Sequence, residues 1–193
     1  MANTVAPRGF RPVCDKSGRP FTGSGTLYYK DATAGIIGVG DPVIRGTNSS
    51  DPDGGPEIVR ATTGAAITGV VIGIAPNRAD LSKKHLAAAD TGYVLVADDP
   101  DLLFAVQEVN SGTALAVTNI GEHIDSIAAV DADTTTGQSK YSIDNAALAA
   151  DNTWRIERLV NKPDNAVGAA AEWLVSANLH TEVNASASTR TAI

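Results

Sequence analysis

Short runs of apolar and β-branched residues alternate with turn-forming residues along most of this chain. Strand-like runs lie at 26–30, 36–44, 57–61, 91–97, 102–109, 154–160 and 173–179. The segments between them are rich in Asp, Asn, Gly and Pro, as at 48–55 (NSSDPDGG), 98–101 (DDPD) and 131–139 (DADTTTGQS). Such residues tolerate or stabilise the backbone of a turn. Many short strands joined by turns are typical of a β-barrel or a β-sandwich.

Helix is predicted at only two places. Ile120, Ile124 and Ile127 follow an i, i+4, i+7 spacing, which favours a short helix or turn over 119–129. The segment 81–89 has a composition that a short helix tolerates. The 18 glycines and 9 prolines among 193 residues oppose longer helices.

The core of the β domain must be built mainly from small and aliphatic side chains. Hydrophobic residues make up 43% of the chain, but aromatic residues only 5%. The most apolar stretch, 65–75, is interrupted by Gly69 and Gly73, which indicates a pair of buried strands or one bulged strand. We therefore predict one mainly β domain over residues 26–183, a small barrel or sandwich for which a jelly roll is one option.

The two ends of the chain differ from this domain. Glycines and prolines recur through the first 25 residues and exclude a regular helix, yet Phe10 lies there between Arg8 and Arg11. We interpret residues 1–25 as an extended N-terminal arm with anchoring side chains. The small, polar residues 184–193 are predicted to form a flexible C-terminal tail.

An acidic charge balance limits the partners of this chain. Asp and Glu number 22 against 15 Lys and Arg, which gives a net charge of −7, and no basic run occurs. Nucleic-acid binding is disfavoured, because neutralising phosphates supplies most of its affinity. The apolar stretch 65–76 is too short to span a bilayer, and no secretory signal is expected at the N-terminus. We expect neither a nucleic acid nor a membrane as partner.

The sequence contains no familiar arrangement of catalytic or metal-binding residues. His85, His123 and His180 are far apart, and Cys14 is the single cysteine. The Asp clusters lack the spacing of a calcium-binding loop, and turn chemistry explains them. The glycines at 35–40 lack the order of a dinucleotide or phosphate loop. We predict no catalytic residue, no metal and no cofactor, which favours a structural or binding role over an enzyme.

Several segments follow the order found in a group of tailed-phage head proteins. They are Pro7–Val13 (PRGFRPV), Gly40–Val43 (GDPV), Gly69–Ala75 (GVVIGIA), Tyr93–Gln107 (YVLVADDPDLLFAVQ), and shorter matches at 119–121, 136–139, 155–165 and 175–180. On these motifs, over about residues 7–180, the chain resembles the cement or decoration proteins of tailed-phage heads. It departs from the group at Ala105, where a glutamate often stands before Val-Gln, which puts in doubt any role for an acid there.

The resemblance implies a virion protein that makes and breaks no bonds. Proteins of this group lie on the outer surface of the capsid, often as trimers, and brace neighbouring major capsid proteins against the pressure of packaged DNA. The implied partners are the phage major capsid protein and further copies of this chain, as a trimer or a dimer. The implied location is the virion, after synthesis in the host cytoplasm.

Four residues of the arm are the candidate contacts to capsid or neighbouring subunit: Arg8, Phe10, Arg11 and Pro12. An arginine can pair with a capsid carboxylate through two hydrogen bonds, while a phenylalanine fills a pocket. The alternative is that Phe10 packs beneath its own β domain. If the arm only grips a partner, deleting residues 2–12 should abolish capsid binding and leave the fold intact.

Three other functions stay open on the sequence alone. The chain could be another virion part, such as a minor head or tail component, although its arm is broken by Gly and Pro rather than paired as a hairpin. It could be a receptor- or glycan-binding module, which the low aromatic content disfavours. It could be an enzyme, which the missing motifs disfavour.

Overall fold

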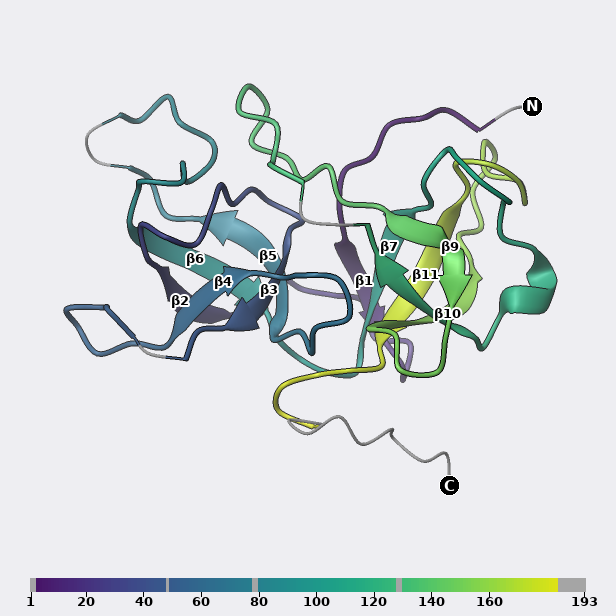
Figure 1. The fold of residues 1–193 in the computed structure, drawn as a ribbon, viewed down its shortest axis with the longest axis horizontal. Coiled ribbons are helices and arrows are strands. Elements are labelled where there is room, and N and C mark those ends of the chain that lie inside the picture. The colour runs from purple at the N-terminus through teal and green to yellow at the C-terminus, as the bar shows by residue number, and fades with distance from the viewer. Residues whose placement is uncertain (1–2, 48, 78–79, 128–129, 184–193) are drawn as a thin grey trace.

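The computed structural model describes residues 3–47, 49–77, 80–127 and 130–183, which form two β units side by side (Figure 1). One unit is a closed five-stranded barrel and the other is an open six-stranded sheet. The mainly β fold class with a barrel and little helix is confirmed. The predicted tail 184–193 lies outside the described residues. No helix within the described residues has the length and apolar character needed to cross a membrane.

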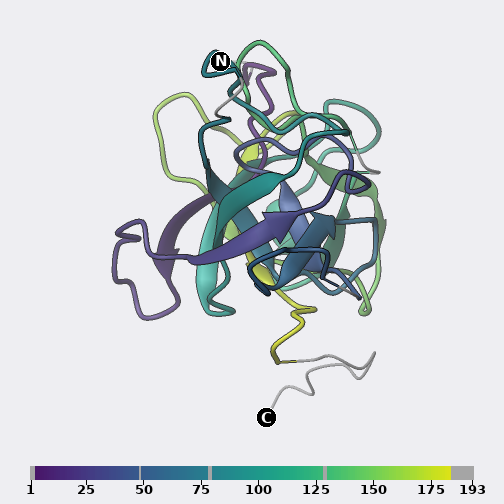
Figure 2. The same ribbon diagram turned by 90° about the vertical axis from the view of Figure 1, so that its left-hand side faces the viewer.

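The barrel is built from the first half of the chain. In sheet order its strands are β2 (Thr26–Lys30), β4 (Glu57–Arg60), β3 (Pro42–Arg45), β5 (Gly69–Ile74) and β6 (Gly92–Ala97). β6 pairs with β2 and closes the ring, which faces the viewer in Figure 2. β5 carries a bulge between Val71 and Gly73. Of the two structures predicted for the apolar stretch 65–75, the single bulged strand is therefore the one that forms.

The six-stranded sheet combines the N-terminal segment with the second half of the chain. In sheet order its strands are β1 (Arg11–Asp15), β7 (Leu102–Gln107), β11 (Glu172–Ala177), β10 (Trp154–Leu159), β8 (His123–Ser126) and β9 (Ile143–Leu148). All neighbouring strands are antiparallel. A closed barrel beside an open sheet differs from a jelly roll, which consists of two facing sheets.

Strand β1 changes the interpretation of the N-terminal arm. Residues 11–15 are the edge strand beside β7, with Pro12 opposite Phe104. The chain then turns back, and Phe21 N donates to Val13 O at 2.9 Å. Residues 10–21 therefore belong to the β fold. The partner of β1 lies almost a hundred residues along the chain, so no local sequence pattern predicts this pairing.

Two apolar cores meet across the shared side of the barrel. Val71 faces the barrel interior, where it packs with residues such as Val94. Val70, the residue before it, points to the opposite face and packs with Phe10 and Trp154 of the sheet unit. Successive side chains on a strand point to opposite faces, so β5 contributes to both cores at once. The barrel and the sheet therefore share apolar packing along this strand.

Of the short helix or turn predicted over 119–129, the described residues 119–127 form no α-helix, and residues 128–129 lie outside the described residues. The structure has a single 3₁₀ turn, η1 (Val117–Asn119), followed by strand β8. Gly121 has a φ of 92°, which ends the turn, and Ile124 then pairs with Trp154 in the sheet. Ile120 is exposed, so the isoleucine spacing does not mark a buried stripe. Strand pairing with β10 outweighs the weak helical pattern.

The segment 81–89 also forms no regular helix. It consists of turns and an isolated bridge between Leu86 and Ile37, whose backbone groups exchange hydrogen bonds of 2.9 and 3.0 Å. Leu86 is buried in the barrel core. The segment covers one end of the barrel, because Leu86 packs in the barrel core.

Candidate functional site

Phe10 anchors the N-terminal segment to the junction between the barrel and the sheet. Its ring stacks on Trp154 with the centroids 4.1 Å apart and the planes inclined by 17°. Its backbone N donates to Gly40 O of the barrel at 2.9 Å, and only 1% of the residue is exposed. The alternative expectation, that Phe10 packs beneath its own β domain, describes its place in the structure.

Glycines let the N-terminal segment approach the barrel closely. A Cβ on Gly9 would lie 2.4 Å from Gly40 O, and one on Gly40 would lie 2.7 Å from Arg8 O. Both residues also have positive φ, 67° for Gly9 and 94° for Gly40, a conformation that favours glycine. Only glycine therefore fits at this crossing without moving one of the two chains.

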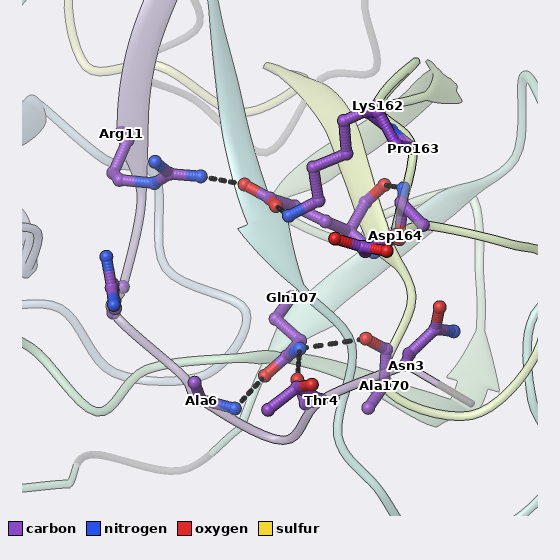
Figure 3. A pocket seen from close by; sticks show the side chains of 13 residues that line it. Asn3, Thr4, Ala6, Arg11, Gln107, Lys162, Pro163, Asp164 and Ala170 are labelled. Atoms are coloured by element: carbon purple, nitrogen blue, oxygen red, sulfur yellow. Dashed lines mark hydrogen bonds and ion pairs between the residues drawn. The ribbon is translucent and has the colours of Figure 1, made fainter. Parts of the chain in front are cut away.

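Arg8 and Arg11 lie next to this crossing in the sequence and line a polar groove at the edge of the six-stranded sheet (Figure 3). The groove has a volume of about 350 Å³. One wall is the N-terminal segment, and the other is the loop between β10 and β11 with the ends of β7 and β11. Its lining residues are Asn3, Thr4, Ala6, Arg8, Gly9, Arg11, Gln107, Lys162, Pro163, Asp164, Asn165, Ala170 and Glu172.

Glu172 is the charged centre of this groove. Its carboxylate accepts from Arg11 Nη2 through Oε1 and from Lys162 Nζ through Oε2, and Figure 3 shows the two cations approaching from different sides. Glu172 is 6% exposed, whereas the Arg11 and Lys162 side chains remain 52% and 46% exposed. Burial lowers the pKa of Arg11, and the nearby positive charge of Arg8 lowers it further.

Amide side chains hold the two walls of the groove in place. Gln107 Nε2 donates to Thr4 O and to Ala170 O, both at 2.8 Å, and its Oε1 accepts from Ala6 N at 2.9 Å (Figure 3). Asn3 Nδ2 donates to Ala166 O at 2.8 Å. The extended segment 3–8 is thereby tied to the β10–β11 loop, which fixes the shape of the groove.

Asn165 ties the same loop to strand β11. Its Oδ1 accepts from Glu172 N at 2.8 Å, and its Nδ2 donates to Val160 O at 2.8 Å. The loop that carries Lys162 is therefore pinned at both of its ends. These contacts hold the loop backbone near Glu172, and the Lys162 ammonium then pairs with the Glu172 carboxylate.

The four candidate contact residues separate into two groups. Arg8 and Arg11 line the groove and are exposed, while Phe10 between them points into the core. Pro12 is half-buried in strand β1 and is not among the residues that line the groove. Sequence reasoning thus placed the two arginines at a common surface, and their contact with a partner stays a prediction.

Three further groove residues were not singled out from the sequence: Gln107, Lys162 and Glu172. Gln107 ends the segment that carries the strongest resemblance, so that segment could have drawn attention to it. Lys162 and Glu172 are ordinary charged residues in sequence. They meet Arg11 only because β11 pairs with β7 and β7 pairs with β1.

The other polar clusters behave as turn and packing elements. Asp51 accepts from Gly55 N at 2.7 Å and from Asp53 N at 3.1 Å, so it stabilises its own loop. His85, His123 and His180 stay apart, and the described residues contain no group of three or more side chains suited to a metal ion. In the glycine-rich stretch 35–40, Gly40 lies at the crossing described above, and a Cβ on Gly38 would lie 2.6 Å from Gly137 O.

Asp41 is a buried carboxyl beside the same crossing. It is fully buried, and its Oδ2 accepts from Gly38 N at 2.8 Å. Burial raises the pKa of Asp41 from 3.8 to about 6, and the hydrogen bonds around it oppose that shift only in part. Between these two pH values the unfolded chain loses the proton while the folded chain keeps it, so stability falls as pH rises to about 6.

The substitution D41N removes this titration. An asparagine oxygen still accepts from Gly38 N, but it carries no charge to bury. We expect the stability of D41N relative to the wild type to be greater by about 2 kcal/mol at pH 7.5 than at pH 4.5. Urea unfolding at the two pH values measures this difference. The control D151N removes an exposed charge, and an equal pH effect there would contradict the assignment.

Comparisons of this chain with protein-family models, with curated proteins and with solved structures find no match.

Proposed function

We propose that this chain is a cement or decoration protein of a tailed-phage head, which binds the outer capsid surface and bridges neighbouring major capsid proteins. The support comes from the positions of the motifs that carry the resemblance. They lie where the N-terminal segment contacts the barrel and where the chain passes from the barrel to the sheet. The first of them, Pro7–Val13, crosses the barrel at Gly40 and becomes edge strand β1. The segment Tyr93–Gln107 contains the last barrel strand, the turn that leaves the barrel, and strand β7 of the sheet.

One observation carries the proposal. The glycines of three separate motifs each lie where a side chain would collide with backbone. Gly9 and Gly40 face each other's chain at the crossing, and a Cβ on Gly69 would lie 2.2 Å from Ala97 O. The fold requires glycine at such positions, so proteins that share the fold are expected to share these glycines. That these positions also carry the resemblance supports a common architecture with the head proteins.

The proposed activity is binding that stabilises the assembled shell. A protein that binds only the mature lattice shifts the equilibrium toward that lattice by the free energy of binding. Each contact with one capsid protein needs an area on the order of 800 Å² per partner. A trimer that contacts several capsid proteins at once gains affinity from multivalency without any stronger single contact.

The test is the mass of the purified protein, alone and with emptied phage heads that lack it. We expect a particle of three chains in solution by light scattering, and saturable rebinding to the heads in a sedimentation assay. Rebound heads should withstand a higher temperature before releasing their contents. Location in the tail or inside the particle by labelled electron microscopy, or no binding to heads, would contradict the proposal.

A further inference from the structure

We propose that the groove formed by Arg8, Arg11 and Lys162 binds a carboxylate side chain of an acidic protein segment. The inference deepens the proposed function, because that segment would belong to a capsid partner, but the groove can be tested without any phage head.

The groove presents more hydrogen-bond donors than its own acids use. A guanidinium has five N–H donors and an ammonium has three. Among the described residues, Arg11 uses Nη2 and Lys162 uses Nζ, each on Glu172, and Arg8 has no ion-pair partner. The exposed part of each cation therefore faces the groove with donors still available. A second carboxylate is the ligand that satisfies them.

The charge at the groove also lacks an anion. Arg8, Arg11 and Lys162 carry three positive charges, against the two negative charges of Asp164 and Glu172. On a chain with a net charge of −7, this is a positive site on an acidic protein. Arg8 and Arg11 also repel each other, as the effect of Arg8 on the pKa of Arg11 indicates. An added anion between them would relieve that repulsion.

The two arginines are held in place before any ligand arrives. Phe10 between them is locked against Trp154, so the backbone on both sides of it is fixed. Arg11 pairs with Ala105 in the sheet, and Gln107 holds Ala6 before Arg8. Binding therefore costs the side chains some freedom but costs the backbone little.

A protein carboxylate fits this groove better than a nucleic-acid phosphate chain. Binding a phosphate backbone requires a row of cations, whereas Asp164 and Glu172 interrupt the three present here. The groove's volume of about 350 Å³ suits one or two acidic side chains.

The experiment is an NMR titration of the ¹⁵N-labelled full chain with an acetylated, amidated peptide of sequence Gly-Ser-Asp-Gly-Glu-Ser-Gly. We expect saturable shifts of the Arg11 Nε–Hε signal and of the backbone amides of Lys162, Asp164 and Asn165. A matched peptide with Asn and Gln in place of Asp and Glu should bind at least about tenfold more weakly, because charge-assisted hydrogen bonds are then lost.

Two variants each remove one arginine charge, the first inside the groove and the second outside it. R8Q should weaken the acidic peptide about tenfold, and its other amide signals should stay in place because Arg8 has no ion-pair partner among the described residues. R158Q, on the exposed face of β10, should leave the affinity unchanged.

Three results would overturn the groove proposal: no shifts at millimolar peptide, equal weakening by R8Q and R158Q, or tighter binding of a twelve-residue oligo-dT than of the acidic peptide. If the peptide binds as expected but the protein fails to bind heads, the groove stands and the proposed function fails. If heads bind wild type and R8Q equally and the peptide gives no shifts, the function stands and the groove fails.

Discussion

Replacing Phe10 by alanine is expected to lower the free energy of unfolding by about 3–5 kcal/mol, the range for removing a large aromatic side chain from a packed core. Phe10 is 1% exposed and stacks on Trp154, which also contacts Phe104 edge-on at 5.7 Å. The cavity left by F10A lies between the barrel and the sheet, so both units lose packing. Urea unfolding followed by tryptophan fluorescence measures the loss.

The control for Phe10 is Val5, which lies in the same segment and is 53% exposed. V5A should change stability by no more than about 0.5 kcal/mol. A variant F10A that unfolds like V5A but no longer binds phage heads would contradict the packing role and restore the partner-contact role expected from the sequence.

The burial of Phe10 also changes what deletion of residues 2–12 is expected to do. The deletion removes an aromatic core residue and the first two residues of edge strand β1, so it should destabilise the fold as well as alter binding. Loss of head binding by that truncation would therefore not separate the two effects. The substitution R8Q separates them, because Arg8 is exposed while Phe10 and strand β1 stay in place.

Replacing Lys30 by methionine is expected to cost about 2–4 kcal/mol of stability, because hydrogen bonds from a buried charged group are lost together. Lys30 is fully buried at the end of β2. Its Nζ lies within hydrogen-bonding distance of four backbone carbonyls, which share its three N–H donors: Asp31 O at 3.0 Å, Ala87 O at 2.9 Å, Ala88 O at 3.1 Å and Asp90 O at 2.7 Å. Burial lowers the pKa of this ammonium, and Asp90 and Asp31 oppose that shift.

The loss should be concentrated at the end of the barrel that the segment 81–89 closes. In K30M we expect faster hydrogen exchange at the Leu86 amide, which donates to Ile37 O at 3.0 Å in the wild type. The control K84M removes an exposed lysine from the same segment and should change stability by at most about 0.5 kcal/mol. Equal stability of K30M and K84M would show that the four carbonyls find other partners.

Strand positions were predictable where apolar residues and turn residues alternate strongly. The runs at 26–30 and 91–97, and the turn at 98–101, match the structure closely. Strand β9 (Ile143–Leu148) was not anticipated, because its sequence IDNAAL has no alternation of β-branched residues. It forms because it pairs with β8. For the same reason residues 123–126 form strand β8, in a segment for which a short helix or turn was expected.

The candidate site was predictable in part. Arg8 and Arg11 were noticed because basic residues next to a large apolar one are unusual in a segment rich in Gly and Pro. The sequence does not decide whether Phe10 is buried, since no local pattern tells whether an aromatic side chain packs on its own chain or on another. Lys162 and Glu172 carried no signal, because nothing in their neighbourhood distinguishes them from solvated charges.

Local chemistry alone determined the mainly β class, the turns and the positions of most strands, because backbone preferences act over a few residues. Tertiary pairing alone decided that the first residues form an edge strand, that β5 serves two cores, and that Arg11 meets Lys162 across Glu172. The physical reason is that hydrogen bonds between strands and the burial of apolar surface join residues about one hundred to one hundred and sixty positions apart, and no short stretch of sequence encodes such a partner.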